Sequence, residues 1–154
     1  MSLEVGDRAP EFSLPADGGS EVALNDYKGK PVVLYFYPKD DTSGCTAEAC
    51  AFRDALPDFG KVKAAVIGIS RDSVASHEKF KAKFKLSFPL ASDEDGLVCQ
   101  AYGVWVEKSM YGRKYMGIER STFLIDGKGV IRKVWRKVKV PGHAEQVLEA
   151  AAAL

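Results

Sequence analysis

Three cysteines are the residues best suited to chemistry, and Cys45 stands where a thiol becomes reactive. It follows the continuous apolar run Pro31–Tyr37, a predicted buried strand, and the polar loop Lys39–Gly44. It also opens an apolar stripe with helical spacing: Cys45, Ala49, Phe52, Leu56. A cysteine in the first turn of a helix faces unpaired backbone N–H groups, and these donors with the helix dipole stabilise a thiolate. Cys45 is therefore a candidate nucleophile; the alternative is a small apolar residue closing the helix start.

The residues around Cys45 carry a family resemblance. Pro38, Thr42 and Cys45 have the spacing P-x-x-x-T-x-x-C, in which the sequence resembles the peroxiredoxins. Cys50 and the run Tyr35–Lys39 narrow the resemblance to the bacterioferritin-comigratory, or peroxiredoxin-Q, subgroup. Further matching segments extend it over nearly the whole chain: Gly6–Pro15, Ser92–Asp95, Tyr102–Trp105 and Arg120–Asp126. Each segment is weak by itself, but the set is specific.

The resemblance implies a role for each matched residue. Cys45 would be the peroxidatic cysteine, whose attack on the O–O bond gives a sulfenic acid and releases water or an alcohol. The Thr42 hydroxyl would hydrogen-bond both the thiolate and the peroxide, and Pro38 would shield the thiolate from water. Arg120 would place a guanidinium beside Cys45 and hold the peroxide oxygen. The alternative for Arg120 is a surface cation at the end of a strand.

Cys50 would be the resolving thiol of such a protein, and its spacing from Cys45 has a geometric consequence. Residues five apart in a helix are separated by about 7.5 Å along the axis and about 140° around it. Their Cα atoms then lie about 8.6 Å apart, beyond the limit of about 7 Å for a disulfide. Cys45 and Cys50 can therefore bond only if the first turns of the helix unwind. The alternative is a buried helix cysteine.

Cys99 lies beside Leu97 and Val98 in a predicted short helix, which favours a buried structural thiol. A second resolving thiol is the alternative, because some relatives carry one on a different helix. In them it lies nearer the region of residues 76–84, where this chain has no cysteine. That difference favours Cys50.

The histidines and cysteines do not form a metal-binding pattern. Zinc takes four ligands. The three cysteines and two histidines of this chain form no C-x-x-C or H-x-x-x-H pair. We therefore expect no metal and no other cofactor. His77 shares an apolar helix face with Phe80 and Phe84, which predicts a histidine at the core edge or surface, and His143 is expected to decorate the start of the last helix.

Composition limits the partners. The 154 residues carry 22 basic and 21 acidic side chains, a net charge of +1, which disfavours nucleic acid or an anionic membrane as the main partner. The aromatic and basic residues between Trp105 and Tyr115 are therefore interpreted as a loop flanking the pocket.

No apolar run approaches the roughly 20 residues of a membrane span. An acidic N-terminus without a signal-like core and an odd number of cysteines predict a cytoplasmic protein.

The order of predicted elements indicates the fold that positions Cys45. An N-terminal β-hairpin, Glu11–Leu14 with Glu21–Leu24, precedes the strand at 31–37. The Cys45 helix should stop before Pro57. The remaining predicted strands are Lys63–Ser70, Phe88–Ala91, Ser121–Asp126 and Val130–Arg136, and the remaining helices span about 73–85, 93–101 and 141–154. This order predicts one domain over residues 1–154, an α/β thioredoxin-like fold with a central mixed β-sheet flanked by helices.

These observations predict a thiol peroxidase that reduces hydrogen peroxide and organic hydroperoxides without a cofactor. By resemblance, thioredoxin or a similar dithiol would recycle the Cys45–Cys50 disulfide in a monomeric or weakly dimeric protein. One alternative is a thioredoxin-type disulfide oxidoreductase, although that activity normally uses C-x-x-C and this chain has C-x4-C. A glutathione-peroxidase-like activity is a further alternative, but it needs a different loop around its cysteine, without the T-x-x-C pattern that this chain has. A non-catalytic holdase on the same fold is the alternative from another functional class.

Overall fold

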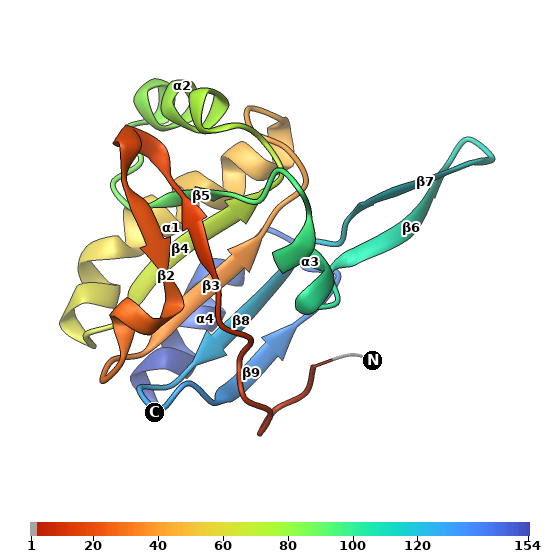
Figure 1. Ribbon diagram of the computed structural model, residues 1–154. Coiled ribbons are helices and arrows are strands. Elements are labelled where there is room, and N and C mark those ends of the chain that lie inside the picture. Colours follow the sequence, from red (N-terminus) through yellow and green to blue (C-terminus); the bar gives the residue numbers. More distant parts are fainter. Residues whose placement is uncertain (1–2) are drawn as a thin grey trace.

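A five-stranded mixed sheet forms the centre of the molecule, which the computed structural model describes over residues 3–154 (Figure 1). Its strands, in the order β5-β4-β3-β8-β9, are β5 (Leu90–Ser92), β4 (Ala65–Ser70), β3 (Val32–Phe36), β8 (Ser121–Ile125) and β9 (Ile131–Trp135). The central strand β3 runs parallel to β4 and antiparallel to β8. All five residues of β3 are buried, as its continuous apolar sequence predicts for a strand covered on both faces.

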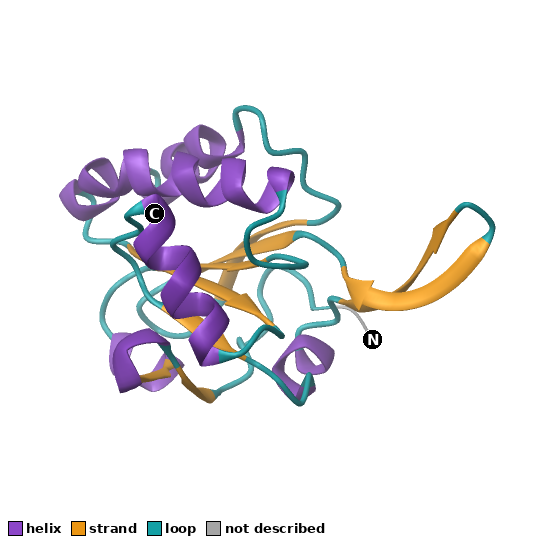
Figure 2. Cartoon of the chain, turned by 90° about the horizontal axis from the view of Figure 1, so that it is seen from above, coloured by secondary structure: helices purple, strands orange, loops and turns teal. Residues whose placement is uncertain are grey.

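Different elements cover the two faces of the sheet (Figures 1 and 2). One face carries α1 (Ser43–Lys61) and α4 (His143–Ala152), which pack against each other. The opposite face carries α3 (Leu97–Ala101) and the hairpin of β1 (Ser13–Pro15) and β2 (Glu21–Ala23), with the short 3-10 turns η1 (Asp17–Gly19) and η2 (Leu24–Tyr27). Helix α2 (Val74–Phe84) lies beside β5. The predicted mixed sheet, flanking helices and N-terminal hairpin are confirmed.

Helix α1 is longer than predicted. The sequence predicted that it would stop before Pro57, but it continues through Pro57 to Lys61. The reason is burial: Phe52 and Phe59 are both fully buried, and their ring centroids lie 6.0 Å apart. The apolar stripe therefore runs past the proline, and packing of Phe59 outweighs the backbone hydrogen bond that Pro57 cannot donate.

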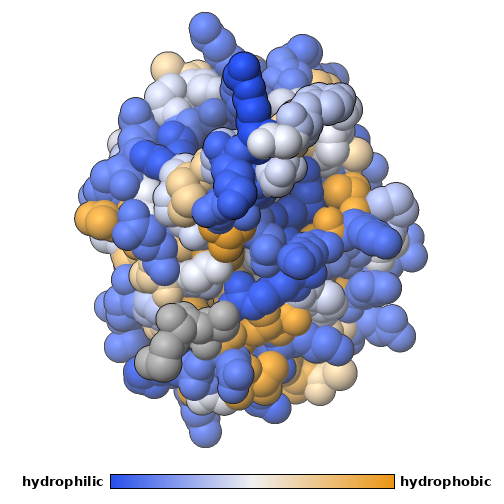
Figure 3. Space-filling view, turned by 90° about the vertical axis from the view of Figure 1, so that its right-hand side faces the viewer, coloured by the Kyte–Doolittle hydropathy of each residue, from blue (hydrophilic) through white to orange (hydrophobic). Residues whose placement is uncertain are grey.

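The segment after α3 is a β-hairpin, where the sequence predicted a loop. Strands β6 (Trp105–Met110) and β7 (Arg113–Ile118) pair antiparallel across Tyr111 and Gly112, both with positive φ. This arm projects from the body (Figures 1 and 2). On the face that bears it, hydrophobic residues form small patches among hydrophilic ones (Figure 3). Most of its side chains are at least partly exposed, so the arm lacks the apolar alternation by which a half-buried strand is recognised.

The prediction for His77 is wrong, whereas His143 lies at the start of the last helix as predicted; both rings are buried. His77 in α2 is fully buried rather than at the core edge. His143, the first residue of α4, is 4% exposed, and its Nε2 lies 2.8 Å from Thr122 Oγ1 on β8. Within the described residues no helix is long and apolar enough to cross a membrane.

Acid should destabilise the fold through His143. Burial first, and then the Arg120 charge, lower the pKa of His143 from 6.5 to about 4. The unfolded chain therefore takes up this proton at higher pH than the folded one, so stability is complete above pH 6.5 and falls towards pH 4. We expect a loss on the order of 2 kcal/mol, discounted for solvent screening. His143→Gln should reduce this loss, measured as the difference in urea midpoint between pH 7 and pH 4.5. An equal fall in both proteins would contradict the assignment.

Candidate active site

Cys45 lies in the first turn of α1, just beyond the end of β3. The chain leaves β3 at Phe36, passes through the loop formed by residues 37–42, and enters the helix at Ser43 with Thr42 as its N-cap. Cys45 is 2% exposed and packs in the core on the helix-covered face of the sheet. The predicted position of a thiol at the start of a helix that follows a buried strand is confirmed. The first backbone N–H groups of a helix have no acceptor within it, so Cys45 lies near the positive end of the α1 dipole.

Arg120 joins Cys45 to a buried carboxyl group. Its Nη2 donates a hydrogen bond to Cys45 Sγ at 3.3 Å, and its Nη1 donates to Glu48 Oε1 at 2.6 Å. Gly44 leaves room for the guanidinium, because a Cβ atom there would lie 3.1 Å from Arg120 Nη2 and crowd it. The structure therefore brings together the predicted pair Cys45 and Arg120, and it excludes the reading of Arg120 as a surface cation.

Glu48 is a site residue that the sequence analysis missed. Its side chain is 1% exposed, and its Oε2 has no hydrogen-bond partner among residues 3–154. Burial raises the pKa of Glu48 to about 7, although the ion pair with Arg120 acts in the opposite direction. Burial lowers the pKa of Arg120, but the charges of Glu48 and Cys45 outweigh it and the net shift is upward. The Arg120 guanidinium thus donates hydrogen bonds to two acidic groups, Cys45 and Glu48. The available signal was the three-residue spacing from Cys45, which puts both side chains on one helix face.

Thr42 and Pro38 lie close to Cys45 in the chain, but the Thr42 hydroxyl has a different partner in this structure. Thr42 Oγ1 donates to the Lys39 carbonyl at 2.9 Å. Its predicted hydrogen bonds to the thiolate and to a peroxide remain predictions. Pro38 lines an open pocket between the loop and the arm, together with Lys108, Trp105 and Ile118. Burial first, and then the Arg120 charge, lower the pKa of Lys108, so this lysine lies in the field of the site.

The other two cysteines differ in their surroundings. Cys50 lies in the same continuous helix as Cys45, and its side chain is partly exposed. Cys99 is completely buried, and its backbone N–H donates to Asp93 Oδ2 at 2.8 Å. Burial, and then the neighbouring Asp93, raise the pKa of the Cys99 thiol strongly. Cys50 is therefore the more accessible of the two, and the environment of Cys99 is that of a structural thiol.

Among the described residues, the one group with metal-ligand proximity contains none of the cysteines. It consists of Asp40, Asp72 and His77, whose ligand atoms lie within 4.8 Å of one another. Their oxygen and nitrogen atoms already take part in hydrogen bonds within the protein.

The comparisons with known proteins agree with this geometry. The AhpC/TSA family model matches residues 5–134. The chain is 57% identical over 148 residues to the putative peroxiredoxin bcp of Coxiella burnetii, covering 96% of this chain and 98% of that protein. It is 51% identical over 149 residues to the peroxiredoxin Bcp of Bacillus subtilis, covering 97% and 95%.

Solved structures show the same relationship. The structure of a Xylella fastidiosa PrxQ variant superposes with a TM-score of 0.94 at 45% identity, covering 99% of this chain and 98% of that one. The bacterioferritin comigratory protein of Xanthomonas campestris, studied for its alkyl peroxide reduction activity, gives a TM-score of 0.88 at 48% identity, covering 92% and 90%.

The chain therefore belongs to the AhpC/TSA family. Within it, the relatives above place the chain among the Bcp, or peroxiredoxin-Q, peroxiredoxins, which confirms the thioredoxin-like fold and the thiol peroxidase function. The three alternative functions are correspondingly disfavoured.

Replacing Arg120 should slow the attack on peroxide. Arg120→Met removes the cation beside Cys45, so the thiolate and the charge developing on the departing oxygen lose an electrostatic stabilisation and peroxide should oxidise Cys45 more slowly. Rapid-mixing kinetics at several pH values will measure this loss. Arg132→Met, which removes a half-exposed arginine on β9, is the matched control and should behave as wild type. A wild-type rate and pH profile in Arg120→Met would contradict a role in the site.

Proposed function

We propose that Cys45 is the peroxidatic cysteine and Cys50 the resolving cysteine of a cofactor-independent peroxidase acting on hydrogen peroxide and organic hydroperoxides. The observation that carries this proposal is the buried Cys45 Sγ in the first turn of α1 with Arg120 Nη2 at 3.3 Å. A cation and oriented backbone N–H groups favour both the thiolate and the negative charge that develops on the departing oxygen. Thr42 and Pro38 are proposed to orient the peroxide and exclude water.

The proposed cycle has three balanced steps. The Cys45 thiolate attacks the nearer oxygen of ROOH, the O–O bond breaks, and with one proton taken up the products are Cys45 sulfenic acid and ROH. The Cys50 thiol then attacks the sulfenic sulfur, so an S–S bond forms and water leaves. An external dithiol, which we infer to be thioredoxin, reduces the disulfide by thiol–disulfide exchange and becomes oxidised itself.

The second step requires α1 to unwind at its start. Both cysteines belong to one continuous helix in the structure, and five residues of intact helix separate their Cα atoms by more than a disulfide spans. A thioredoxin-type oxidoreductase, with two cysteines three residues apart, avoids this step. The unwound segment would also expose the disulfide to its reductant.

The remaining predictions concern the setting of the protein. Three free cysteines suit a reducing compartment, for which we propose the cytoplasm. We also propose that residues 1–154 act as one domain and that the protein works as a monomer or a weak dimer, because each proposed catalytic residue comes from the same chain.

Cys45→Ser should abolish peroxide consumption, because a hydroxyl at that position supplies no thiolate. Cys99→Ser is the matched control: it changes the same atom in a buried thiol away from Arg120, and it should keep most of the activity. Peroxide consumption with a recycling dithiol measures both. Retained turnover in Cys45→Ser would rule out the proposed nucleophile.

Cys50→Ser should separate the first step from the second. The variant should still consume one equivalent of peroxide, because the attack on the O–O bond needs only Cys45. It should then stop as the sulfenic acid, be driven to the sulfinic acid by excess peroxide, and lose thioredoxin-dependent turnover. Intact mass after one and after ten equivalents of peroxide distinguishes these species. Unimpaired recycling would transfer the resolving role to Cys99 or to an external thiol.

A further inference from the structure

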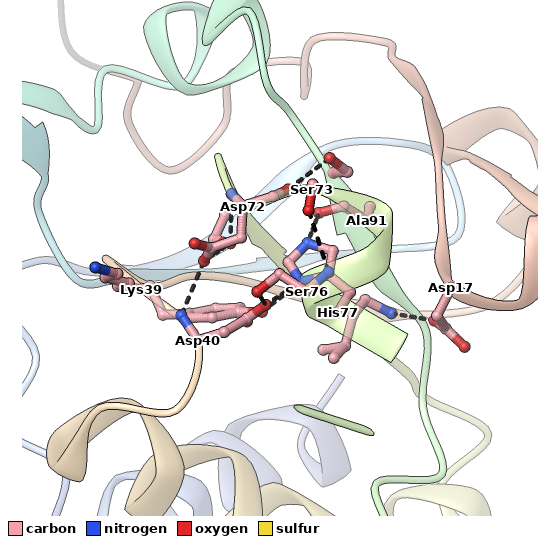
Figure 4. Close-up of polar contacts among 12 residues, drawn as sticks. Asp17, Lys39, Asp40, Asp72, Ser73, Ser76, His77 and Ala91 are labelled. Atoms are coloured by element: carbon pink, nitrogen blue, oxygen red, sulfur yellow. Dashed lines mark hydrogen bonds and ion pairs between the residues drawn. The ribbon is translucent and has the colours of Figure 1, made fainter. Parts of the chain in front are cut away.

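A largely buried polar cluster joins the loop that leads from β3 into α1 to its neighbours. We call it the Asp40 cluster; its members are Tyr37, Asp40, Asp72, Ser76 and His77, and the last four are labelled in Figure 4. Among the described residues, no member of the cluster forms a hydrogen bond with the Cys45 side chain. The cluster therefore lies outside the site described above, yet it holds the same loop.

Asp40 is fixed at both its side chain and its backbone. The carboxyl group is 7% exposed, and its Oδ1 accepts a hydrogen bond from Tyr37 Oη at 2.6 Å. Its Oδ2 accepts from Ser76 Oγ at 2.8 Å and lies 2.7 Å from His77 Nδ1. The Asp40 N–H donates to Asp72 Oδ2 at 2.8 Å. One loop residue is thus tied to the end of β3, to α2 and to the segment that follows β4.

His77 is the link between this loop and the sheet edge. The ring is fully buried, with Asp40 on one side and the Ala91 carbonyl of β5 on the other, 3.0 Å from Nε2 (Figure 4). A carbonyl only accepts, so Nε2 donates. At the other nitrogen, a distance of 2.7 Å between Nδ1 and Oδ2 requires a proton between them, since two lone pairs would otherwise face each other. The ring is therefore held from both sides by hydrogen bonds.

Thr42 lies two residues after Asp40, and two hydrogen bonds fix its conformation. Its hydroxyl donates to the carbonyl of Lys39, which immediately precedes Asp40, and its own carbonyl accepts the Thr46 N–H at 2.8 Å. The intervening Asp41 has a positive φ of 56°, so the chain turns sharply between the cluster and the helix. A displacement of Asp40 would therefore displace both Pro38 and Thr42.

We propose that Asp40 and His77 are positioning residues for peroxide reduction: they hold the loop so that Pro38 and Thr42 face the peroxide bound at Cys45. This inference rests on the proposed function. Neither residue would touch the substrate. Stability alone does not call for a buried Asp40–His77 pair, because well-packed apolar residues of similar volume often stabilise a fold equally well. The pair therefore suits a role in fixing the geometry of the loop.

The test compares two reactions of Cys45 in the same variants. Oxidation by hydrogen peroxide needs both a thiolate and a correctly shaped loop, whereas alkylation by iodoacetamide needs an accessible thiolate without the peroxide contacts. Asp40→Asn keeps the size of the side chain and removes its charge. Asp41→Asn makes the same chemical change at the next residue, which is exposed and, within the described part of the chain, pairs only with the exposed Lys83. His77→Asn retains a polar group near the Nδ1 position, and His77→Leu removes it.

We expect Asp40→Asn and His77→Leu to slow peroxide oxidation of Cys45 about tenfold or more, since small misplacements in an active site have large effects on rate. Their alkylation rates should stay within about threefold of wild type, and His77→Asn should recover part of the oxidation rate. Asp41→Asn should match wild type in both reactions. Mass spectrometry of Cys45 follows both.

Two results would overturn the inference. One is an oxidation rate in Asp40→Asn equal to that of Asp41→Asn. The other is alkylation that accelerates strongly while oxidation is lost, which would mean that the cluster only keeps Cys45 buried. Failure of the proposed function itself would look different, because the peroxide-oxidised residue in the unmutated protein would then be a residue other than Cys45.

Discussion

The ion pairing of one partly buried guanidinium, that of Arg120, is the interaction on which the rest of the site depends. Arg120 faces two acidic groups at once, Cys45 and Glu48, and a buried charge without a partner is costly. Two ionised acids and one cation would leave an uncompensated negative charge inside the protein. A Glu48 pKa raised to about 7 means that this carboxyl group is protonated for part of the time near neutral pH. The neighbouring Tyr35 adds no charge, since burial, and then Glu48, raise its pKa well above the usual range.

The sheet register explains why these groups meet. Phe36, the last residue of β3, pairs with Ser121, the first residue of β8, so Arg120 lies beside the point where the chain leaves the sheet for α1. The helix that starts there supplies Cys45 and Glu48 from one face, and Gly44 leaves room for the guanidinium. The arrangement of Cys45, Glu48 and Arg120 thus arises from two neighbouring strands and one helix start.

Sequence alone predicted the buried strand, the start of α1 and the residues of the family motif, because these depend on local apolar periodicity and on spacing. It did not predict Glu48, since an acidic residue in a helix is normally solvated and only the tertiary position of Arg120 buries it. The same holds for His77, whose acceptors lie 37 and 14 residues away along the chain. The arm of β6 and β7 escaped prediction because its side chains are largely exposed and it packs little of the core.

The proposed disulfide formation between Cys45 and Cys50 requires the chain to unwind between two residues that are held in place. On one side Asp40 is held by the Asp40 cluster; on the other, Phe52 is fully buried and stacks on Tyr35 with ring centroids 4.7 Å apart. Between them Ala47 and Ala49 bring little surface, and each backbone hydrogen bond lost costs only about 0.5–1.5 kcal/mol. Oxidation to the neutral sulfenic acid would weaken the attraction between Arg120 and Cys45, whereas the Arg120–Glu48 pair would still have to break. The proposed unwinding would move Glu48 into water, where its pKa would return towards 4.5 and the carboxyl group would release a proton. Rising pH through this range would therefore favour the unwound helix in which Cys45 and Cys50 can meet.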